Sequence, residues 1–356
     1  MNYLTTNEIA KLWKISNRRV QILASHGRIK GAVKKSGVWL IPENTSKPTV
    51  SKKNECLKNN RRKLKTLLKT VTSEFSYLPP QELRTHILSA IHSLLIFNLS
   101  KNIFNNNLFF DEYVYTKYLS DSGVKFNQKL FSDIRSKIGN TFDFKHNLED
   151  ILSWSYQYLN LFLNDNDQSS TQFFTENYMI DYLLDNIDPN ISLFDPCCGG
   201  GNILSQAVEY YYSHSGIELN EILRNLVGYE IDPLLANIAV LNLKLKSLEL
   251  LKSNNIEVDF NTWTNLTPNI FTSVDSTEFR GSLDTTPIIN IETKEKNTTD
   301  IFLNNFSNVI TNPPFATIKG MDGSLSNFLK INYPNSNSDV CVAFLKRLVD
   351  FLLITE

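Results

Sequence analysis

The chain has 356 residues and a formal net charge of -1, and 42% of its residues are hydrophobic, which suits two or three soluble domains with buried cores. Its most apolar stretch, Ile87–Leu99, contains His92 and is too short to cross a bilayer, so we expect no membrane span. The four cysteines form no CxxC pair or metal-ligand spacing and the N-terminus has no signal-peptide pattern, so we expect a cytoplasmic protein without bound metal.

The charge is concentrated at one end. Residues 1–70 contain 17 lysines and arginines but only three acids, which gives this part a charge of +14 and leaves -15 for the rest. A basic block of this kind indicates a polyanionic partner, most simply nucleic acid. The alternative is a solubilising basic linker, which fits Lys52–Lys69 better than the patterned segment before it.

Residues 1–48 are predicted to form a small helix-turn-helix unit. Thr6 and Ser16 can each cap a helix. Apolar residues at helical spacing predict one small core, formed by Ile9, Leu12, Ile15, Val20 and Leu23. After Gly31, two short strands ending in Val38–Pro42 predict a hairpin or wing.

The pattern from Glu8 to Pro42 resembles the winged excisionase and MerR-like DNA-binding family. The resemblance implies that the second helix enters the major groove and that the wing meets phosphates. The implied DNA contacts are Asn17, Arg18, Arg19 and Gln21 on the helix, and Lys34 and Lys35 on the wing. The alternative is a helical module that contacts other proteins.

Residues 49–70 are predicted to be a basic linker, and residues 71–165 a mainly helical domain. Within the latter, apolar residues recur at helical spacing, at Leu83, Ile87, Ile91 and Leu95. No catalytic signature is present there. The stretch Asp150–Tyr158 resembles the segment just ahead of the core of large type II adenine methyltransferases.

From residue 171 onward, strand-like apolar runs alternate with helical segments. The runs are Ile191–Phe194, Leu226–Glu230 and Val309–Ile310. This alternation predicts an α/β fold with a parallel, Rossmann-like sheet over residues 171–356.

A glycine-rich loop, Asp195–Gly201, follows the first of these runs and precedes a helix. Glycines let a backbone approach a ligand closely, and the next helix presents free N–H groups. Dinucleotide and phosphate sites share these features. A second acid, Glu230, ends the next strand, where it can accept both hydroxyls of a ribose. The alternative is that Glu230 is a surface acid.

The loop Asn312–Phe315, with the sequence Asn-Pro-Pro-Phe, ends another apolar strand. The exocyclic amine of adenine is a weak nucleophile, because its lone pair is delocalised into the ring. Two acceptors, the Asn312 side-chain oxygen and the Pro313 carbonyl, can bind its two N–H groups and favour a more tetrahedral nitrogen. The prolines stiffen the loop, and Phe315 can stack on the base. The base must leave the duplex first.

These motifs resemble those of the gamma-type N6-adenine DNA methyltransferases, which include type II, type IIG and type I modification proteins. The resemblance implies S-adenosyl-L-methionine as cofactor. It implies cofactor contacts by Phe174 and Thr175 at the carboxylate, Asp195 at the amino-acid end, Cys197 (usually alanine), Gly199 and Gly201 beneath the ribose and methionine, and Ile231 and Asp232 in the adenine pocket. It places Asn312, Pro313, Pro314 and Phe315 in the catalytic loop. Either Asp284 or Asp275 would hold the adenine amine of the cofactor.

The implied function is that of a site-specific, adenine-specific DNA methyltransferase in a restriction-modification system, with double-stranded DNA as its partner. One alternative is an RNA or protein amino-methyltransferase, since similar loops act on guanine amines and glutamine amides. The other is a non-catalytic DNA-binding remnant.

Residues 339–345 resemble the helix that precedes the fifth strand of this family, and the sequence stops at Glu356. The family has three more strands and a target-recognition domain. We therefore expect an incomplete, four-stranded sheet in a truncated or split protein, which is inactive alone or completed by a second polypeptide.

Overall fold

The computed structural model describes residues 3–13, 16–25, 29–35, 38–45, 52–99, 108–120, 124–142, 144, 148–163, 175, 177–275, 280–302, 306, 308–315, 323–335 and 339–352. The chain divides into two compact units, Met1–Asn60 and Arg61–Glu356, which are described separately.

The first unit is a small helix pair with a three-stranded antiparallel sheet of order β1-β3-β2. Its elements are β1 (Tyr3–Thr5), α1 (Thr6–Trp13), α2 (Asn17–Ser25), β2 (Val33–Lys35) and β3 (Val38–Pro42). The predicted helices and hairpin are thus present. Gly31 has a φ of +78°, and an added Cβ would lie 3.0 Å from the Pro42 ring, so the turn before the hairpin requires glycine.

The core of this unit differs from the expectation at one described position. Leu12 is 62% exposed, because the buried stripe of α1 runs through Ile9, Ala10 and Trp13 instead. The first turn of α1 is closed by the Glu8 carboxylate, which accepts from the backbone amide and the hydroxyl of Thr5, each at 2.8 Å. Ile15 lies outside the described residues, as does the side chain of Leu23.

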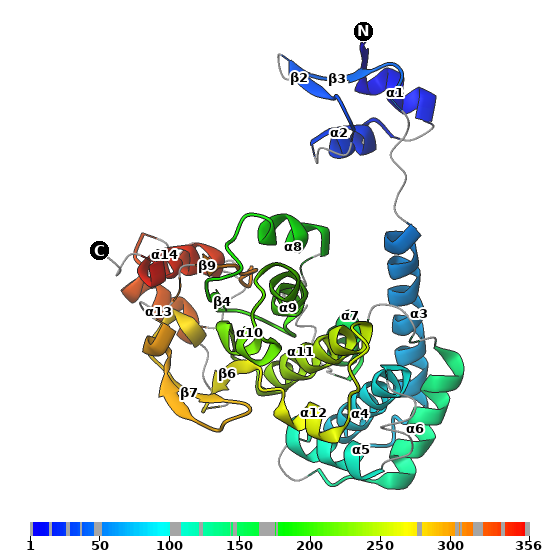
Figure 1. The fold of residues 1–356 in the computed structure, drawn as a ribbon, viewed down its shortest axis with the longest axis vertical. Helices are drawn as coiled ribbons and strands as arrows, with labels where there is room; N and C mark the ends of the chain where they lie inside the picture. Colours follow the sequence, from blue (N-terminus) through cyan, green and yellow to red (C-terminus); the bar gives the residue numbers. More distant parts are fainter. Residues whose placement is uncertain are drawn as a thin grey trace. The chain divides into compact units, whose positions relative to one another are not determined.

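The second unit begins with a layer of helices (Figure 1). They are α3 (Lys52–Glu74), which belongs to this unit from Arg61 onward, α4 (Pro80–Leu99), α5 (Leu108–Val114), the π-helix η1 (Tyr115–Leu119), α6 (Gln128–Thr141) and α7 (Leu148–Leu163). Part of the predicted basic linker is therefore helical. The reason is an apolar face on α3, whose members Leu64, Leu67, Leu68 and Val71 are buried in the core.

A six-stranded sheet of order β8-β7-β6-β5-β4-β9 follows. Its parallel part contains β4 (Leu193–Asp195), β5 (Leu226–Glu230), β6 (Asn269–Ser273) and β9 (Asn308–Val309), and its antiparallel part β7 (Pro287–Asn290) and β8 (Lys296–Thr298). The expected α/β class and parallel strands are confirmed. The sheet has two more strands than expected, because the chain after β6 turns back as a hairpin on that edge.

Helices surround this sheet. They are α8 (Asn177–Leu184), α9 (Asn202–His214), α10 (Leu219–Asn225), α11 (Pro233–Ser253), α12 (Phe260–Asn265), α13 (Gly323–Asn332) and α14 (Val340–Leu352), with 3-10 turns η2 (Gly281–Leu283) and η3 (Thr299–Phe302). Helix α11 is buried along most of its length and packs against α7 on one side and α9 on another. One hydrophobic core therefore runs from α3 to the end of β9, so the helical layer and the sheet fold as one body. No helix in the described part of the chain is long and apolar enough to span a membrane.

A buried ionic cluster joins the two parts of this body. The ammonium of Lys244 on α11 is fully buried, donates to the backbone carbonyls of Trp263 and Leu266, and lies 3.2 Å from the carboxylate of Glu292. Glu292, in the turn after β7, also accepts from Lys117 at 2.8 Å and from the Tyr118 hydroxyl at 2.6 Å. The cluster thus connects η1 of the helical layer to the β7–β8 hairpin.

We predict that Glu292→Gln lowers the free energy of unfolding by about 3 kcal/mol, because it leaves the buried Lys244 ammonium without a compensating charge. Chemical denaturation followed by circular dichroism measures this difference. Glu295→Gln on the same hairpin is the matched control, since Glu295 is exposed. Equal stability of the two variants would contradict a structural role for the cluster.

Candidate cofactor and catalytic site

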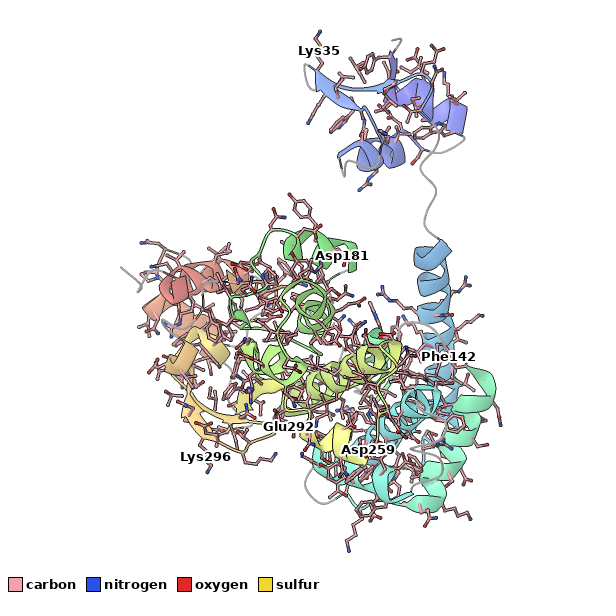
Figure 2. The ribbon with its side chains drawn as sticks, in the orientation of Figure 1. Lys35, Phe142, Asp181, Asp259, Glu292 and Lys296 are labelled. Atoms are coloured by element: carbon pink, nitrogen blue, oxygen red, sulfur yellow. The ribbon has the colours of Figure 1, made fainter. Side chains whose placement is uncertain are left out.

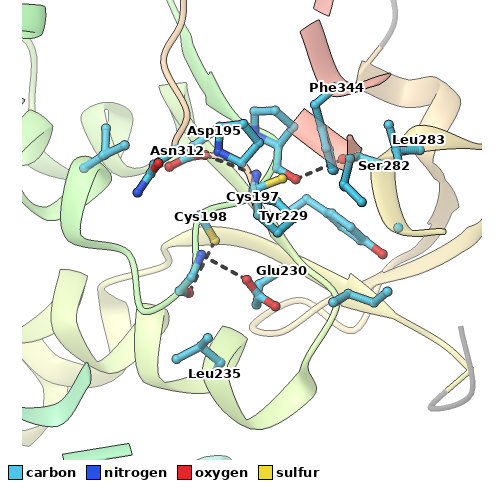
Figure 3. A pocket seen from close by; sticks show the side chains of 18 of the residues that line it. Asp195, Cys197, Cys198, Tyr229, Glu230, Leu235, Ser282, Leu283, Asn312 and Phe344 are labelled. Atoms are coloured by element: carbon cyan, nitrogen blue, oxygen red, sulfur yellow. Dashed lines mark hydrogen bonds between the residues drawn. The ribbon is translucent and has the colours of Figure 1, made fainter. Parts of the chain in front are cut away.

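A cavity of about 300 Å³ lies where the loops after β4, β5 and β9 meet (Figure 3). The glycine-rich loop, Glu230 and the Asn312–Pro314 loop all contribute to its wall. The remaining wall comes from residues 280–283 and from side chains on α13 and α14. The carboxyl ends of parallel strands are where doubly wound α/β folds bind ligands, so the position fits a cofactor site.

Asp195 ends β4 and is fully buried at the cavity wall. Its Oδ1 accepts the backbone N–H of Cys197 at 3.1 Å, which starts the turn into the glycines. Burial raises the pKa of Asp195 to about 7, although the Thr311 hydroxyl and the Cys197 amide act in the opposite direction. The other oxygen, Oδ2, is buried and forms no hydrogen bond of normal geometry with the described residues. A buried oxygen of this kind is suited to a hydrogen-bond donor of a ligand.

The glycines of the loop have different tasks. Gly199 and Gly201 have φ values of +55° and +80°, which only glycine adopts readily. Gly199 lines the cavity, whereas Gly201 does not. An added Cβ at Gly201 would lie 3.0 Å from the Cβ of Ala239 on α11. Gly201 therefore serves the close packing of α9 on α11, and the predicted contact of Gly201 with the cofactor remains a prediction.

Glu230 ends β5 beside this loop and is 7% exposed. Its carboxylate accepts the backbone N–H of Gly199 at 3.0 Å and that of Asp232 at 3.0 Å, so it ties the turn after β4 to the turn after β5. Burial raises its pKa to about 7, and the nearby carboxylates of Asp232 and Asp195 add to this. Glu230 and Ile231 both line the cavity, and their predicted contacts with the ribose and the adenine of a cofactor remain predictions.

Asp232 lies outside the cavity wall. Its carboxylate caps α11 by accepting the amides of Leu234 at 2.9 Å and Leu235 at 3.2 Å, and it also accepts the hydroxyl of Tyr156 on α7. The structure thus gives Asp232 a capping role, while its predicted place in an adenine pocket remains untested.

The loop after β9 brings Asn312, Pro313 and Pro314 to the same cavity. It starts from a fixed strand end, where the amide of Ile310 donates to the Phe194 carbonyl at 3.1 Å. Phe315 is 49% exposed and does not line the cavity. Thr175 lines it, whereas Phe174 lies outside the described residues.

Neither acid proposed for the cofactor adenine lines the cavity. Asp275 is exposed. The carboxylate of Asp284 is paired with Arg280 and accepts the amide of Thr285 at 2.8 Å. It borders a neighbouring hollow of about 480 Å³ that also contains Lys346.

Ser282 and Leu283, which precede Asp284, face the cavity instead. The Ser282 hydroxyl donates to the Pro196 carbonyl at 2.9 Å, which joins this wall to the glycine loop. Phe344 and Val340 of α14 also line the cavity, as does Tyr229 of β5 (Figure 3). Tyr229, Val340 and Phe344 lie within stretches that the sequence motifs cover, and Ser282 and Leu283 directly precede Asp284. Periodicity does not indicate which of these side chains face a ligand.

The predicted DNA contacts of the first unit lie on its surface where they are described. Arg18, Gln21, Lys34 and Lys35 are exposed, and Lys35 projects from the end of β2 (Figure 2). Asn17 is half-buried and its side chain donates to that of Asn7. The side chain of Arg19 lies outside the described residues. The DNA roles of all six residues remain predictions.

Comparison with known proteins found a family match for part of the second unit. Residues 224–353 match the Eco57I restriction-modification methylase family. This segment contains Glu230 and the Asn312–Phe315 loop, and the match confirms the expected resemblance to restriction-modification methylases for that part of the chain. No curated protein sequence matches the chain.

Several solved structures are similar to this chain at low identity. One is a DrdV–DNA complex, with a TM-score of 0.48, 13% identity, and coverage of 87% of this chain and 35% of that chain. Another is the type IIL restriction-modification enzyme MmeI in complex with DNA, with a TM-score of 0.48, 14% identity, and coverage of 83% of this chain and 48% of that chain. A modification subunit of a putative type I restriction enzyme from Vibrio vulnificus YJ016 has a TM-score of 0.43, 16% identity, and coverage of 82% of this chain and 67% of that chain. The chain spans about a third of the first protein and about half of the second.

We predict that the two buried carboxylates destabilise the protein as the pH rises. Their pKa values are raised in the folded state from 3.8 and 4.5 to about 7, so the folded protein binds more protons than the unfolded chain in that interval. Stability present below about pH 4 is therefore lost as the pH rises through 7. Urea denaturation at pH 5 and pH 8 measures the loss.

The double variant Asp195→Asn, Glu230→Gln serves as the comparison, because both side chains keep their shape and no longer titrate. We expect a smaller decrease in stability between the two pH values than in the native protein. The same decrease in both proteins would show that these carboxyls titrate normally.

Proposed function

We propose that this chain contains the cofactor-binding and catalytic parts of a DNA methyltransferase that modifies adenine N6 in a restriction-modification system. The observation that carries the proposal is the shared cavity, in which the Asn312–Pro314 loop lies in the same wall as Asp195 and Glu230. Two acids suited to a cofactor and an acceptor pair suited to an exocyclic amine therefore meet in one site.

The residues present fit S-adenosyl-L-methionine. The unpaired, buried oxygen of Asp195 suits the ammonium of the methionine part, and the Glu230 carboxylate suits two ribose hydroxyls. Ile231, Leu283 and Phe344 supply apolar and aromatic surface for an adenine ring. When bound, this cofactor supplies an electrophilic methyl group on a sulfonium.

The Asn312–Phe315 loop then positions the target amine. The Asn312 side-chain oxygen and the Pro313 carbonyl accept its two N–H groups, which localises the lone pair on the nitrogen. The exposed ring of Phe315 stacks on the flipped base. Positioning provides most of the rate increase, since in-line methyl transfer needs no covalent enzyme intermediate. The proton lost from the amine leaves to solvent after transfer.

The DNA substrate fits the charge of the first unit. Its exposed cations include Arg18, Lys34 and Lys35, and backbone phosphates are the natural partners of such a surface.

We further propose that strand pairing at β9 completes the sheet. In the described part of the chain β9 pairs with β4 alone, and a further strand, from this protein or from a second polypeptide, would cover its other edge.

We predict that Asn312→Ala abolishes methyl transfer while the cofactor still binds. The substitution removes one of the two acceptors for the amine and none of the acids assigned to the cofactor, so the transfer rate should fall at least about a hundredfold. Transfer of a radioactive methyl group from the cofactor to unmethylated duplex DNA, followed by nucleoside analysis, measures it.

Asn308→Ala is the matched control, because Asn308 lies on β9, the strand that leads into the loop, and is not part of the cavity wall; its side chain donates to the Asp188 carbonyl at 3.0 Å. It should retain transfer. Equal incorporation by the native protein and Asn312→Ala would refute the role of Asn312. Label recovered in RNA or protein but not in DNA would favour the alternative amino-methyltransferase functions.

A second prediction concerns DNA affinity. The double variant Lys34→Ala, Lys35→Ala should weaken binding to duplex DNA and reduce the slope of log affinity against log salt by about 2, since each phosphate contact contributes about 0.9. Fluorescence anisotropy over a salt series measures this slope. Lys294→Ala, Lys296→Ala on the β7–β8 hairpin removes the same charge elsewhere, and an equal change in that control would contradict a specific role for the wing.

A further inference from the structure

Helix α7 of the helical layer lies directly behind the glycine loop. Ser153, at 0% exposure, is the point of contact. An added Cβ on Gly200 would lie 2.1 Å from the Ser153 hydroxyl oxygen, so α7 and the loop approach as closely as their backbones allow. Gly200, the middle glycine of the loop, is therefore required by the close approach of α7, and it does not line the cavity.

A fully buried amide completes this contact. The Asn242 side chain on α11 donates to the Gly200 carbonyl at 2.8 Å and to the Ser153 hydroxyl at 3.0 Å. The Ser153 hydroxyl lies 3.3 Å from the side-chain oxygen of Asn202, to which it donates. Because all these groups are buried, water does not replace their hydrogen bonds.

Asn202 connects this network to the cavity. It is 5% exposed and lines the cavity wall at the start of α9. Its oxygen is occupied by Ser153, whereas its Nδ2 forms no hydrogen bond with the described residues. Ser153 thereby fixes the orientation of an amide whose N–H groups remain available to an acceptor in the cavity, such as a carboxylate.

The same helix reaches the second turn of the site. The Tyr156 hydroxyl, one turn along α7 from Ser153, donates to the Asp232 carboxylate that caps α11. Burial and the neighbouring Asp232 carboxylate raise the pKa of Tyr156, so the hydroxyl keeps its proton. The Asp232 amide in turn donates to Glu230. Helix α7 thus supports the turns after both β4 and β5.

We propose that Ser153, Asn242 and Tyr156 are positioning residues, which hold the glycine loop and the Glu230 turn in the geometry that binds the cofactor. This inference rests on the proposed cofactor site. It assigns a structural role to the Asp150–Tyr158 stretch, which contains Ser153 and Tyr156. Cofactor binding then depends on a helix outside the Rossmann-like part of the unit.

The test compares variants of the full chain that differ only in which hydroxyl of α7 is lost. Ser153→Ala and Tyr156→Phe remove the contacts with the two turns. Ser155→Ala and Tyr158→Phe are the matched controls, because Ser155 is also fully buried but donates within its own helix to Ile151, and Tyr158 contacts Lys65 instead.

Two readouts are measured for each variant. One is the affinity for S-adenosylhomocysteine by calorimetry, which should weaken about tenfold in Ser153→Ala and in Tyr156→Phe, the effect of one lost hydrogen bond. The other is the rate of alkylation of Cys198 in a short pulse of N-ethylmaleimide, read by mass spectrometry. The Cys198 thiol is 6% exposed within the loop, so faster labelling reports loop opening without any cofactor.

We expect both readouts to change in the test variants and neither in the controls. Unchanged labelling and affinity in Ser153→Ala and Tyr156→Phe would overturn the inference, and so would equal changes in the controls. If the native protein fails to bind S-adenosylhomocysteine, the proposed function falls, whereas the labelling rates still decide whether α7 holds the loop. Thermal melting of each variant separates loop opening from general loss of stability.

Discussion

The site depends on one hydrogen-bonded link, between the Glu230 carboxylate and the backbone amide of Gly199. β4 and β5 are parallel neighbours in the sheet, so the turns that follow them start side by side. The carboxylate holds them together by accepting one amide from each turn. The arrangement places a second carboxylate, Asp195, in the same buried wall, and burial raises the pKa of both acids. A ligand that brings hydroxyl groups and a positive charge stabilises the two buried carboxylates, whereas an anionic ligand destabilises them further.

The helical layer is part of this arrangement and not an accessory to it. The buried residues of α3, α4 and α7 continue into those of α9 and α11 as one core. The Lys244–Glu292 cluster adds a second connection, from the middle of α11. Displacing α7 would therefore remove the Ser153 contact with Gly200 and Asn242 and the Tyr156 contact with Asp232. The cavity thus depends on the helical layer as well as on the sheet.

Much of the fold could be predicted from the sequence, because local patterns determine it. The apolar runs at β4, β5 and β9 and the acid at each of the first two strand ends are visible without coordinates. The lining of the cavity by Thr175, Asp195, Glu230 and Asn312 agrees with those expectations. Long-range packing could not be predicted. Nothing local shows that Leu12 is exposed, that the basic stretch before Leu64 continues as a helix, or that Ser282 faces the cavity beside Asp284. Similarly, the repeated glycines indicate a ligand, whereas Gly200 and Gly201 accommodate α7 and α11.

The first unit closes a core of its own, built from seven buried residues of α1, α2, β3 and the turn before β2. Its exposed basic residues are thus supported by side chains that play no part in the core around the cofactor cavity. Mutations that reshape the basic surface change one set of packing contacts, and mutations in the Asn312–Phe315 loop change another. Substitutions on the surface of the first unit can therefore accumulate without altering the packing around the cavity of the second unit. Exchange of the first 60 residues in the laboratory would test this independence.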